Sequence, residues 1–171
     1  LLLPTFYKQI DISRVLKIQL QKKFDLNFTF NQDIKYNFFP RPHFVITESI
    51  IKNDTDQISR INKLIIYISL DNLFSLKNIE VKDLIFDNSN FYLNKNNNNF
   101  FLNLLNKNFK DGNLTIKNSN IFFRNIENEV LFINKIIKMK YFYNAKELKN
   151  IFYSENEIFN IPFSIESFFN E

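Results

Sequence analysis

Histidine and carboxylate side chains are the first candidates for chemistry in this sequence, and their spacing does not predict a catalytic centre. His43 is the only histidine and the chain has no cysteine, so a zinc site and a histidine-activated nucleophile both lack partners. Asp83 and Asp87, like Glu127 and Glu129, have no neighbouring histidine or arginine that would fit general acid–base work. We therefore expect packing or solvent-exposed roles for these groups, with no catalytic residue, no enzyme activity, no metal and no cofactor.

Phosphate-binding loops and nucleic-acid binding are also not expected. Gly112 is the only glycine, so no glycine-rich loop can form, and "KDGN" around it predicts a hairpin turn. The net charge is +4, from 22 basic and 18 acidic residues, and the lysines are scattered along the chain. A nucleic-acid-binding domain more often carries a basic stripe, so we keep a nucleic-acid or ribosome-associated protein only as a third alternative.

Alternation of apolar and polar residues predicts that most of the chain forms strands. The "PRP" segment at 40–42 interrupts the pattern because proline donates no hydrogen bond. A reversal of parity predicts a bulge near Lys82–Asp83, and Pro162 predicts an edge strand or the end of a ladder. From Leu131 to Tyr143, the odd positions are expected to share one face. The expected strands cover 24–30, 44–50, 62–70, 78–86, 130–143 and 158–166.

Three segments have helical character. "RVLKIQLQKKF" (14–24) predicts a short amphipathic helix with Ser13 as its N-cap. "NFFLNLLNKNF" (99–109) has apolar residues at helical spacing. "NAKELKNIF" (144–152) contains the only alanine together with good helix formers, and Asn144 could cap it.

Two related segments, "NSNFYL" at Asn88–Leu93 and "NSNIFF" at Asn118–Phe123, are 30 residues apart. Asparagine readily adopts positive φ, so each Asn-Ser-Asn predicts a tight turn or bulge after an apolar strand. We interpret the pair as a structural repeat; the alternative is two similar hairpins. The asparagine tract at Asn94–Asn99 is interpreted as a loop produced by an AT-rich genome, because the chain is rich in asparagine, isoleucine, phenylalanine and lysine.

The apolar faces of the predicted strands must be buried against another surface. Burial of one isoleucine or phenylalanine side chain is worth roughly 1.5–3 kcal/mol, and each strand offers several on one face. In a closed sandwich the cover is a second sheet. In an open, curved sheet it could be the acyl chains of a lipid, and the sequence pattern is the same in both cases.

The order of these pieces resembles the N-terminal region of the AsmA family. The resemblance begins with "LLLP", "YKQIDIS" and "RVLKIQLQKKF", and continues through "FDLNFTFNQDIKYNFF", the Pro-Arg-Pro turn and "HFVITESII". Further on, "KLIIYISLDNLFSLKNIEVKDLIFDNSNFYL" and "GNLTIKNSNIFFRN" look like two copies of the family's recurrent unit. One departure is the absence of a Thr-Gly-Arg-like turn, in whose place stand "KKFDLN" and "NQDIK".

The resemblance implies a mainly β fold with a few short helices. It would be a curved, mostly antiparallel, U-shaped sheet with an N-terminal amphipathic helix, of the kind shared with TamB and chorein-type lipid-transfer proteins. Residues 1–171 would form a single segment of a longer chain, with 1–24 as a linker and helix and 25–171 as the repeated strand region. "LLLP" would end an upstream transmembrane helix, because three leucines are far too few to span a bilayer.

The resemblance also implies a function without catalysis. The chain would be the periplasmic part of a protein anchored in the inner membrane of a Gram-negative bacterium, acting in outer-membrane biogenesis, phospholipid transport between membranes and regulation of protein targeting to the membrane. The expected partners are phospholipid and the membrane, and no nucleic acid. The alternative is a β-sandwich or solenoid that binds protein without lipid. The residues expected to face the lipid groove are Leu64, Ile66, Ile68, Ile133, Ile137, Phe159, Ile161, Phe163 and Ile165.

Overall fold

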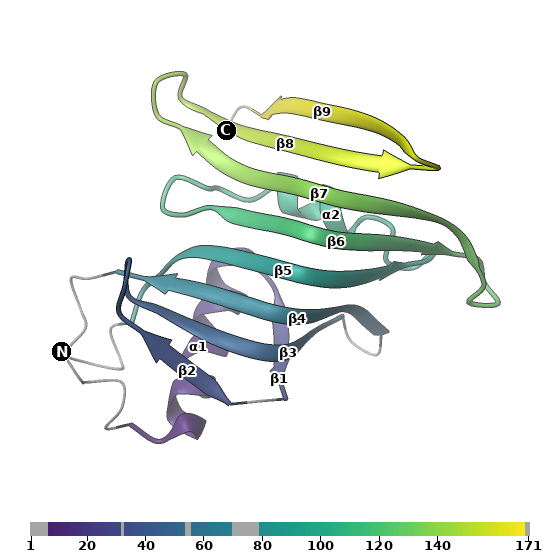
Figure 1. Ribbon diagram of the computed structural model, residues 1–171. Coiled ribbons are helices and arrows are strands. Elements are labelled where there is room, and N and C mark those ends of the chain that lie inside the picture. The colour runs from purple at the N-terminus through teal and green to yellow at the C-terminus, as the bar shows by residue number, and fades with distance from the viewer. Residues whose placement is uncertain (1–6, 32, 54–55, 70–78, 170–171) are drawn as a thin grey trace.

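The computed structural model describes residues 7–31, 33–53, 56–69 and 79–169. In these residues, nine strands form one sheet, and two helices lie against it (Figure 1). The helices are α1 (Gln9–Phe24) and α2 (Phe100–Leu105). The strands are β1 (Asn27–Phe30), β2 (Ile34–Asn37), β3 (His43–Asn53), β4 (Asp56–Ile68), β5 (Val81–Leu93), β6 (Leu114–Arg124), β7 (Val130–Asn144), β8 (Lys149–Ile158) and β9 (Ile161–Phe169).

The sheet is open and mostly antiparallel. Its strand order is β1-β3-β4-β5-β6-β7-β8-β9, with β2 also paired to β3. All neighbouring strands are antiparallel except β5 and β6, which run parallel. From β1 and β2 at one edge to β9 at the other, the strands fan out in a twisted, curved layer that does not close on itself (Figure 1). This confirms the predicted fold class.

Helix α1 is amphipathic and ends at Phe24, as predicted, but it begins five residues earlier than predicted. The helix begins at Gln9, so Ser13 lies inside it and is not the N-cap. Phe24, also expected to open a strand, is the last residue of the helix, and the chain turns away at Asp25 with φ of 57°. The buried stripe has a spacing of four residues, which places its members on one side of a helix. These are Ile12, Leu16, Leu20 and Phe24.

The helix predicted over 144–152 is wrong, whereas the one predicted within 99–109 is confirmed as α2. Residues 145–148 form a turn, and β8 begins at Lys149. The Asn144 side-chain oxygen accepts a hydrogen bond from the Lys146 backbone N–H at 3.0 Å, which closes a local turn. Leu148 then adopts φ of 53°, a left-handed conformation that a helix does not contain.

The expected single strand over 158–166 is also divided by a turn. Phe159 and Asn160 have φ of 50° and 62°, and they connect β8 to β9 as a two-residue hairpin loop. Positive φ at both central residues is the pattern of a type I′ turn. Phenylalanine gives no sequence signal for such a turn, so the alternation of apolar residues concealed it.

Gly112 does not form the predicted hairpin, because β6 follows it and runs parallel to β5. Its φ is not in the left-handed region, and among the residues that the structure describes the eight with positive φ are all other amino acids. Instead, Gly112 allows its own backbone to lie very close to the backbone of Lys82. A Cβ at this position would overlap the carbonyl oxygen of Lys82 and would lie 2.6 Å from the carbonyl carbon.

The two Asn-Ser-Asn segments lie side by side in β5 and β6. The parallel register pairs residues that are 30 apart, from Leu84 with Leu114 to Leu93 with Phe123. Asn88 and Asn118, the first asparagine of each segment, have φ of 56° and 51°. The predicted positive φ is therefore confirmed, and the pair is one structural repeat rather than two hairpins.

Side chains connect the two copies of the repeat. The Oγ of Ser119 accepts the backbone N–H of Ser89 at 3.0 Å, in a buried position. The Asn120 amide donates to the Asn90 side-chain oxygen at 3.2 Å. The positive φ at Asn88 reverses the alternation of β5, so the buried positions change from even to odd numbers after it. The positive φ of these asparagines therefore determines which residues project to each face of the sheet.

Further irregularities lie in β5 and β7. The bulge predicted near Lys82–Asp83 is confirmed, because β4 advances two residues where β5 advances three. In β7, a register shift lies between Ile136 and Lys138. The odd positions of 131–143 therefore do not share one face: Tyr141 is buried, whereas Ile133 lies on the opposite side with an exposed fraction of 44%.

One hydrophobic core lies between the sheet and the helices. The α1 stripe belongs to the same buried cluster as the central strands and α2. Phe91 of β5 packs against Phe100 and Phe101 of α2, with ring centroids 5.9 and 5.1 Å apart. We call the side of the sheet that carries α1 and α2 the helix-bearing face, and the other side the helix-free face. In the described residues, no helix or strand covers the helix-free face (Figure 1).

Candidate functional site

Three apolar side chains of β9 form an exposed surface at one edge of the sheet. Ile161, Phe163 and Ile165 alternate along this strand, with exposed fractions of 67%, 36% and 44%. We call these three residues the edge surface. Within the described residues, β9 pairs only with β8. Pro162 therefore lies in an edge strand, as predicted.

The strand register places the edge surface on the helix-bearing face. Ile165 is paired with Ser154 of β8, which is paired with Met139 of β7. Side chains of paired residues project to the same side of a sheet, and Met139 is in the core with only 4% exposed. Between core and edge lies a narrow buried polar strip, in which the Asn156 amide donates to Ser154 Oγ at 2.7 Å. The edge surface thus lies on the same side of the sheet as the core and is separated from it by this polar strip.

Leu64, Ile66 and Ile68, three of the predicted groove residues, also face this side of the sheet. They are at most 5% exposed and belong to the cluster that includes the α1 stripe. In this structure they are packed in a core covered by protein. A ligand could reach them only if the helix moved away.

The remaining predicted groove residues do not join the edge surface. Ile133 is paired with Phe122 and projects with it from the helix-free face. Ile137 occupies the extra position of the β7 irregularity and is 42% exposed. Phe159 lies in the β8–β9 turn and is 77% exposed. Of the nine residues, the three of β9 form one uncovered apolar surface, and Ile133 and Phe159 line a separate hollow of about 470 Å³ between β7 and the β8–β9 turn.

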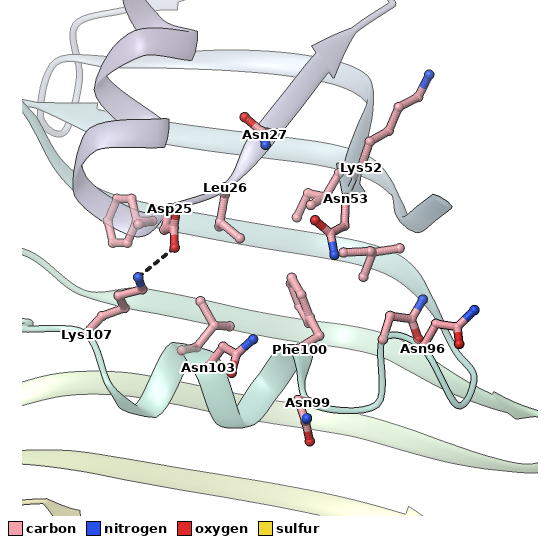
Figure 2. A pocket seen from close by; sticks show the side chains of 15 residues that line it. Asp25, Leu26, Asn27, Lys52, Asn53, Asn96, Asn99, Phe100, Asn103 and Lys107 are labelled. Carbon is pink, nitrogen blue, oxygen red and sulfur yellow. Dashed lines mark hydrogen bonds and ion pairs between the residues drawn. The ribbon is translucent and has the colours of Figure 1, made fainter. Parts of the chain in front are cut away.

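A cleft of about 270 Å³ lies near the end of α1, between the β3–β4 hairpin and α2. Figure 2 shows Phe100 and Leu26 pointing toward each other between these elements, whereas Asn99 points away from them. We call it the amide-lined cleft. One ion pair crosses its rim, between Lys107 Nζ and Asp25 Oδ2 at 2.8 Å. The asparagines of the lining are Asn27, Asn53, Asn96, Asn97, Asn99 and Asn103.

The amide-lined cleft suits a small apolar group with a neutral polar end. Amides both donate and accept hydrogen bonds, and the floor consists of buried apolar side chains. Part of the rim is the asparagine tract that we interpreted as a loop. Asn97 orders this tract, because its side chain accepts the N–H of Asn94 at 2.7 Å and donates to the Tyr92 carbonyl at 3.1 Å. Sequence reasoning missed the cleft, since its walls come from distant segments.

The titratable groups considered from the sequence have structural partners. His43 is buried, and its Nδ1 donates to the Arg41 carbonyl oxygen at 2.7 Å. Asp87 accepts a hydrogen bond from the Asn118 amide at 3.0 Å and forms an ion pair with Lys117 at 3.3 Å. Burial raises the pKa of Asp87, but these hydrogen bonds and the nearby lysine charges outweigh it and lower the pKa below its ordinary value.

Neither family models nor curated proteins match this sequence when compared with it. In the part of the chain that the structure describes, no helix is long and apolar enough to span a bilayer. Within those same residues, no three histidine, cysteine or acidic side chains lie close enough together to hold a metal ion.

Proposed function

We propose that this chain is a non-catalytic, lipid-binding segment of the AsmA type, whose open sheet binds the acyl chains of phospholipid. The observation that carries the proposal is the edge surface. Beyond α2 and the buried polar strip, the same side of the sheet carries three exposed apolar side chains on β9, which pairs only with β8 within the described residues. In a closed sandwich, a second sheet would cover this position, and the described residues contain none.

The energetics favour an apolar ligand at the edge surface. Full burial of an isoleucine or phenylalanine side chain gains roughly 1.5–3 kcal/mol, and each methylene of an acyl chain gains about 0.8 kcal/mol. Ile161, Phe163 and Ile165 lie at alternate positions, so they cover about 13 Å of an extended strand at about 3.3 Å per residue. An acyl chain lying along β9 would contact all three side chains.

Two further features support the proposal. The amide-lined cleft lies beside α1 and α2, which cover the same face, and its apolar floor could hold the end of an acyl chain. The in-register pairing of β5 and β6 repeats a unit of 30 residues across the sheet. A sheet that grows by adding such units provides a longer groove with each addition.

In this proposal the chain works in the periplasm of a Gram-negative bacterium, attached to the inner membrane by an upstream transmembrane helix. It would carry phospholipid between the two membranes, and so contribute to outer-membrane biogenesis and to the regulation of protein targeting to the membrane. The order of sequence elements that resembles the AsmA family supports this setting, together with the open curved sheet.

A second candidate function is protein binding without lipid. The unpaired edge of β9 presents backbone N–H and C=O groups, to which a partner could add a strand. Pro162 removes one of the N–H donors of this strand. Strand addition would leave the side chains of the edge surface available as specificity contacts.

Native mass spectrometry of the chain, purified from a Gram-negative host without detergent, tests the lipid proposal. We expect co-purified phospholipid, and we expect it to be lost in Ile161→Asp/Phe163→Asp. The control is Phe168→Asp, because Phe168 is 53% exposed on the same strand but points to the helix-free face. Lipid that is absent from the folded parent, or lost equally in both variants, would overturn the proposal and favour protein binding.

A further inference from the structure

The helix-free face contains a cavity of about 520 Å³ that none of the features above uses. It lies over strands β4 to β8 and is bounded on one side by Arg41, the central residue of the Pro-Arg-Pro segment. We propose that this cavity is a binding site for a phosphate group. It is separate from the edge surface, which lies on the opposite face, and the proposal does not depend on lipid binding there.

Arg41 is held in a fixed orientation at the cavity. Its guanidinium lies 4.3 Å from the centre of the Tyr67 ring and forms an ion pair with Asp83 Oδ2 at 2.8 Å. Its carbonyl oxygen accepts the hydrogen bond from His43. A guanidinium has five N–H donors in a planar fork, so donors remain after the contact with Asp83. A pre-oriented arginine of this kind loses little entropy when it binds an anion.

The one carboxylate in the lining is already satisfied. Asp83 Oδ1 accepts two hydrogen bonds from Asn113, from the backbone N–H at 3.0 Å and from the side-chain amide at 3.1 Å. Its other oxygen pairs with Arg41. Asp83 therefore positions Arg41, and within the described residues no ion pair joins it to the other cations of the cavity.

Two lysines supply the positive charge that remains. Lys138 and Lys140 are alternate residues of β7, so both project from the helix-free face into the lining. Among the ion pairs of the described residues, none involves either lysine. Glu155, which lies opposite Lys138 in β8, accepts the Tyr153 hydroxyl at 2.6 Å. The lining thus has three cations against one carboxylate.

This combination fits a phosphate group attached to an organic body. A guanidinium fork and two ammonium groups match the geometry and charge of phosphate oxygens. Tyr67 and Phe142 form apolar walls beside the cations, and the cavity is larger than a phosphate group alone requires. The phosphate could belong to a lipid headgroup or to a soluble phosphate compound, because both present the same oxygens.

Isothermal titration calorimetry at low ionic strength tests the site with two probes, inorganic phosphate and glycerol 3-phosphate. We expect saturable binding that weakens at least about tenfold in Lys138→Gln/Lys140→Gln. The matched control is Lys22→Gln/Lys95→Gln, which removes the same charge from exposed positions outside the lining of the cavity. We expect this control to bind within about twofold of the parent, with circular dichroism confirming that both variants fold.

Tighter binding of glycerol 3-phosphate than of inorganic phosphate would support the site and assign it to a phosphate attached to an organic body such as glycerol. Equal binding of the two probes would support the site and assign it to free phosphate. Two results would overturn the proposal: no saturable binding of either probe to the parent, or an equal loss in both double variants, which would show a general charge effect. Retained phosphate binding in Phe163→Asp would separate this site from the edge surface.

Discussion

Replacing Gly112 with alanine is expected to destabilise the fold markedly, although the residue does not have positive φ. The new Cβ would overlap the Lys82 carbonyl oxygen and would lie 3.0 Å from Lys23 Nζ. This ammonium donates to the carbonyl oxygens of Val81 and Asp111 at 2.6 and 2.8 Å. Lys23 therefore joins the two backbone segments that the alanine would push apart.

The magnitude follows from three opposing contributions. Overpacking against backbone typically costs about 1–3 kcal/mol, and weakening of a hydrogen bond from a charged donor adds about 1.5 kcal/mol. Alanine recovers about 0.4–1 kcal/mol by restricting the unfolded chain. We therefore expect a net loss of about 2–3 kcal/mol for Gly112→Ala. At a typical urea dependence of about 1–3 kcal/mol per molar, the midpoint would fall by roughly 1 M or more.

Urea unfolding followed by far-UV circular dichroism measures this shift. Asp111→Ala is the control, because it changes the adjacent residue but keeps the carbonyl oxygen that Lys23 binds. We expect its loss to stay below about 1 kcal/mol, as for most surface substitutions. A Gly112→Ala midpoint within about 0.3 M of the parent, or above it, would refute the close-approach explanation.

Three further predictions concern the kinks and turns. Ser119→Ala should lower the free energy of unfolding by about 1–3 kcal/mol, because the buried N–H of Ser89 would lose its acceptor. Ser89→Ala should lower it by at most about 0.5 kcal/mol, since the buried Oγ of Ser89 has no partner within the described residues. Because the pKa of Asp87 is lowered in the folded chain, its carboxylate stabilises the fold at pH values above the unfolded-state pKa. This contribution disappears as the pH falls through the folded-state pKa. Asp87→Asn should therefore make the free energy of unfolding less dependent on acid pH. Leu148→Asn should add about 0.5–1 kcal/mol, because asparagine tolerates the left-handed φ of this exposed position better than leucine.

Urea midpoints at neutral pH test the serine and Leu148 substitutions, and a series of midpoints from about pH 6 to pH 2 tests Asp87→Asn. Equal losses for the two serine variants would contradict the assigned hydrogen bond. An unchanged acid slope in Asp87→Asn would show that this carboxylate has the same pKa in the folded and unfolded chain. A destabilised Leu148→Asn would mean that packing of the leucine outweighs its backbone strain.

Local signals in the sequence predicted much of the architecture. The four-residue apolar spacing identified α1 because each member of the stripe meets the same core. The reversal of parity at Lys82–Asp83 identified a bulge, since an extra residue necessarily exchanges the two faces of a strand. The recurrence of Asn-Ser-Asn identified the repeat, because asparagine is, after glycine, the residue best suited to positive φ.

Other features were not predictable from local patterns. Glu48, Leu148 and Phe159 adopt positive φ without the residue types that normally indicate it, so the β8–β9 turn and the β7–β8 turn were missed. Which part of the sheet the helices cover depends on the tertiary structure and not on the local sequence. Leu64 and Ile161 therefore lie in the same alternating pattern, although Leu64 is buried and Ile161 is exposed. The amide-lined cleft and the cavity beside Arg41 each combine residues from distant segments, which a single sequence does not place together.

Site-specific photo-crosslinking is the most direct test of lipid binding at the edge surface. A benzophenone amino acid would replace Phe163 in one variant and Phe168 in another, two residues of β9 that point to opposite faces. Each variant would be irradiated in a Gram-negative host, and the purified protein analysed by mass spectrometry for lipid adducts. We predict phospholipid adducts at position 163 and none above background at position 168. Adducts at neither position, or equal adducts at both, would contradict a lipid-binding surface on the helix-bearing face.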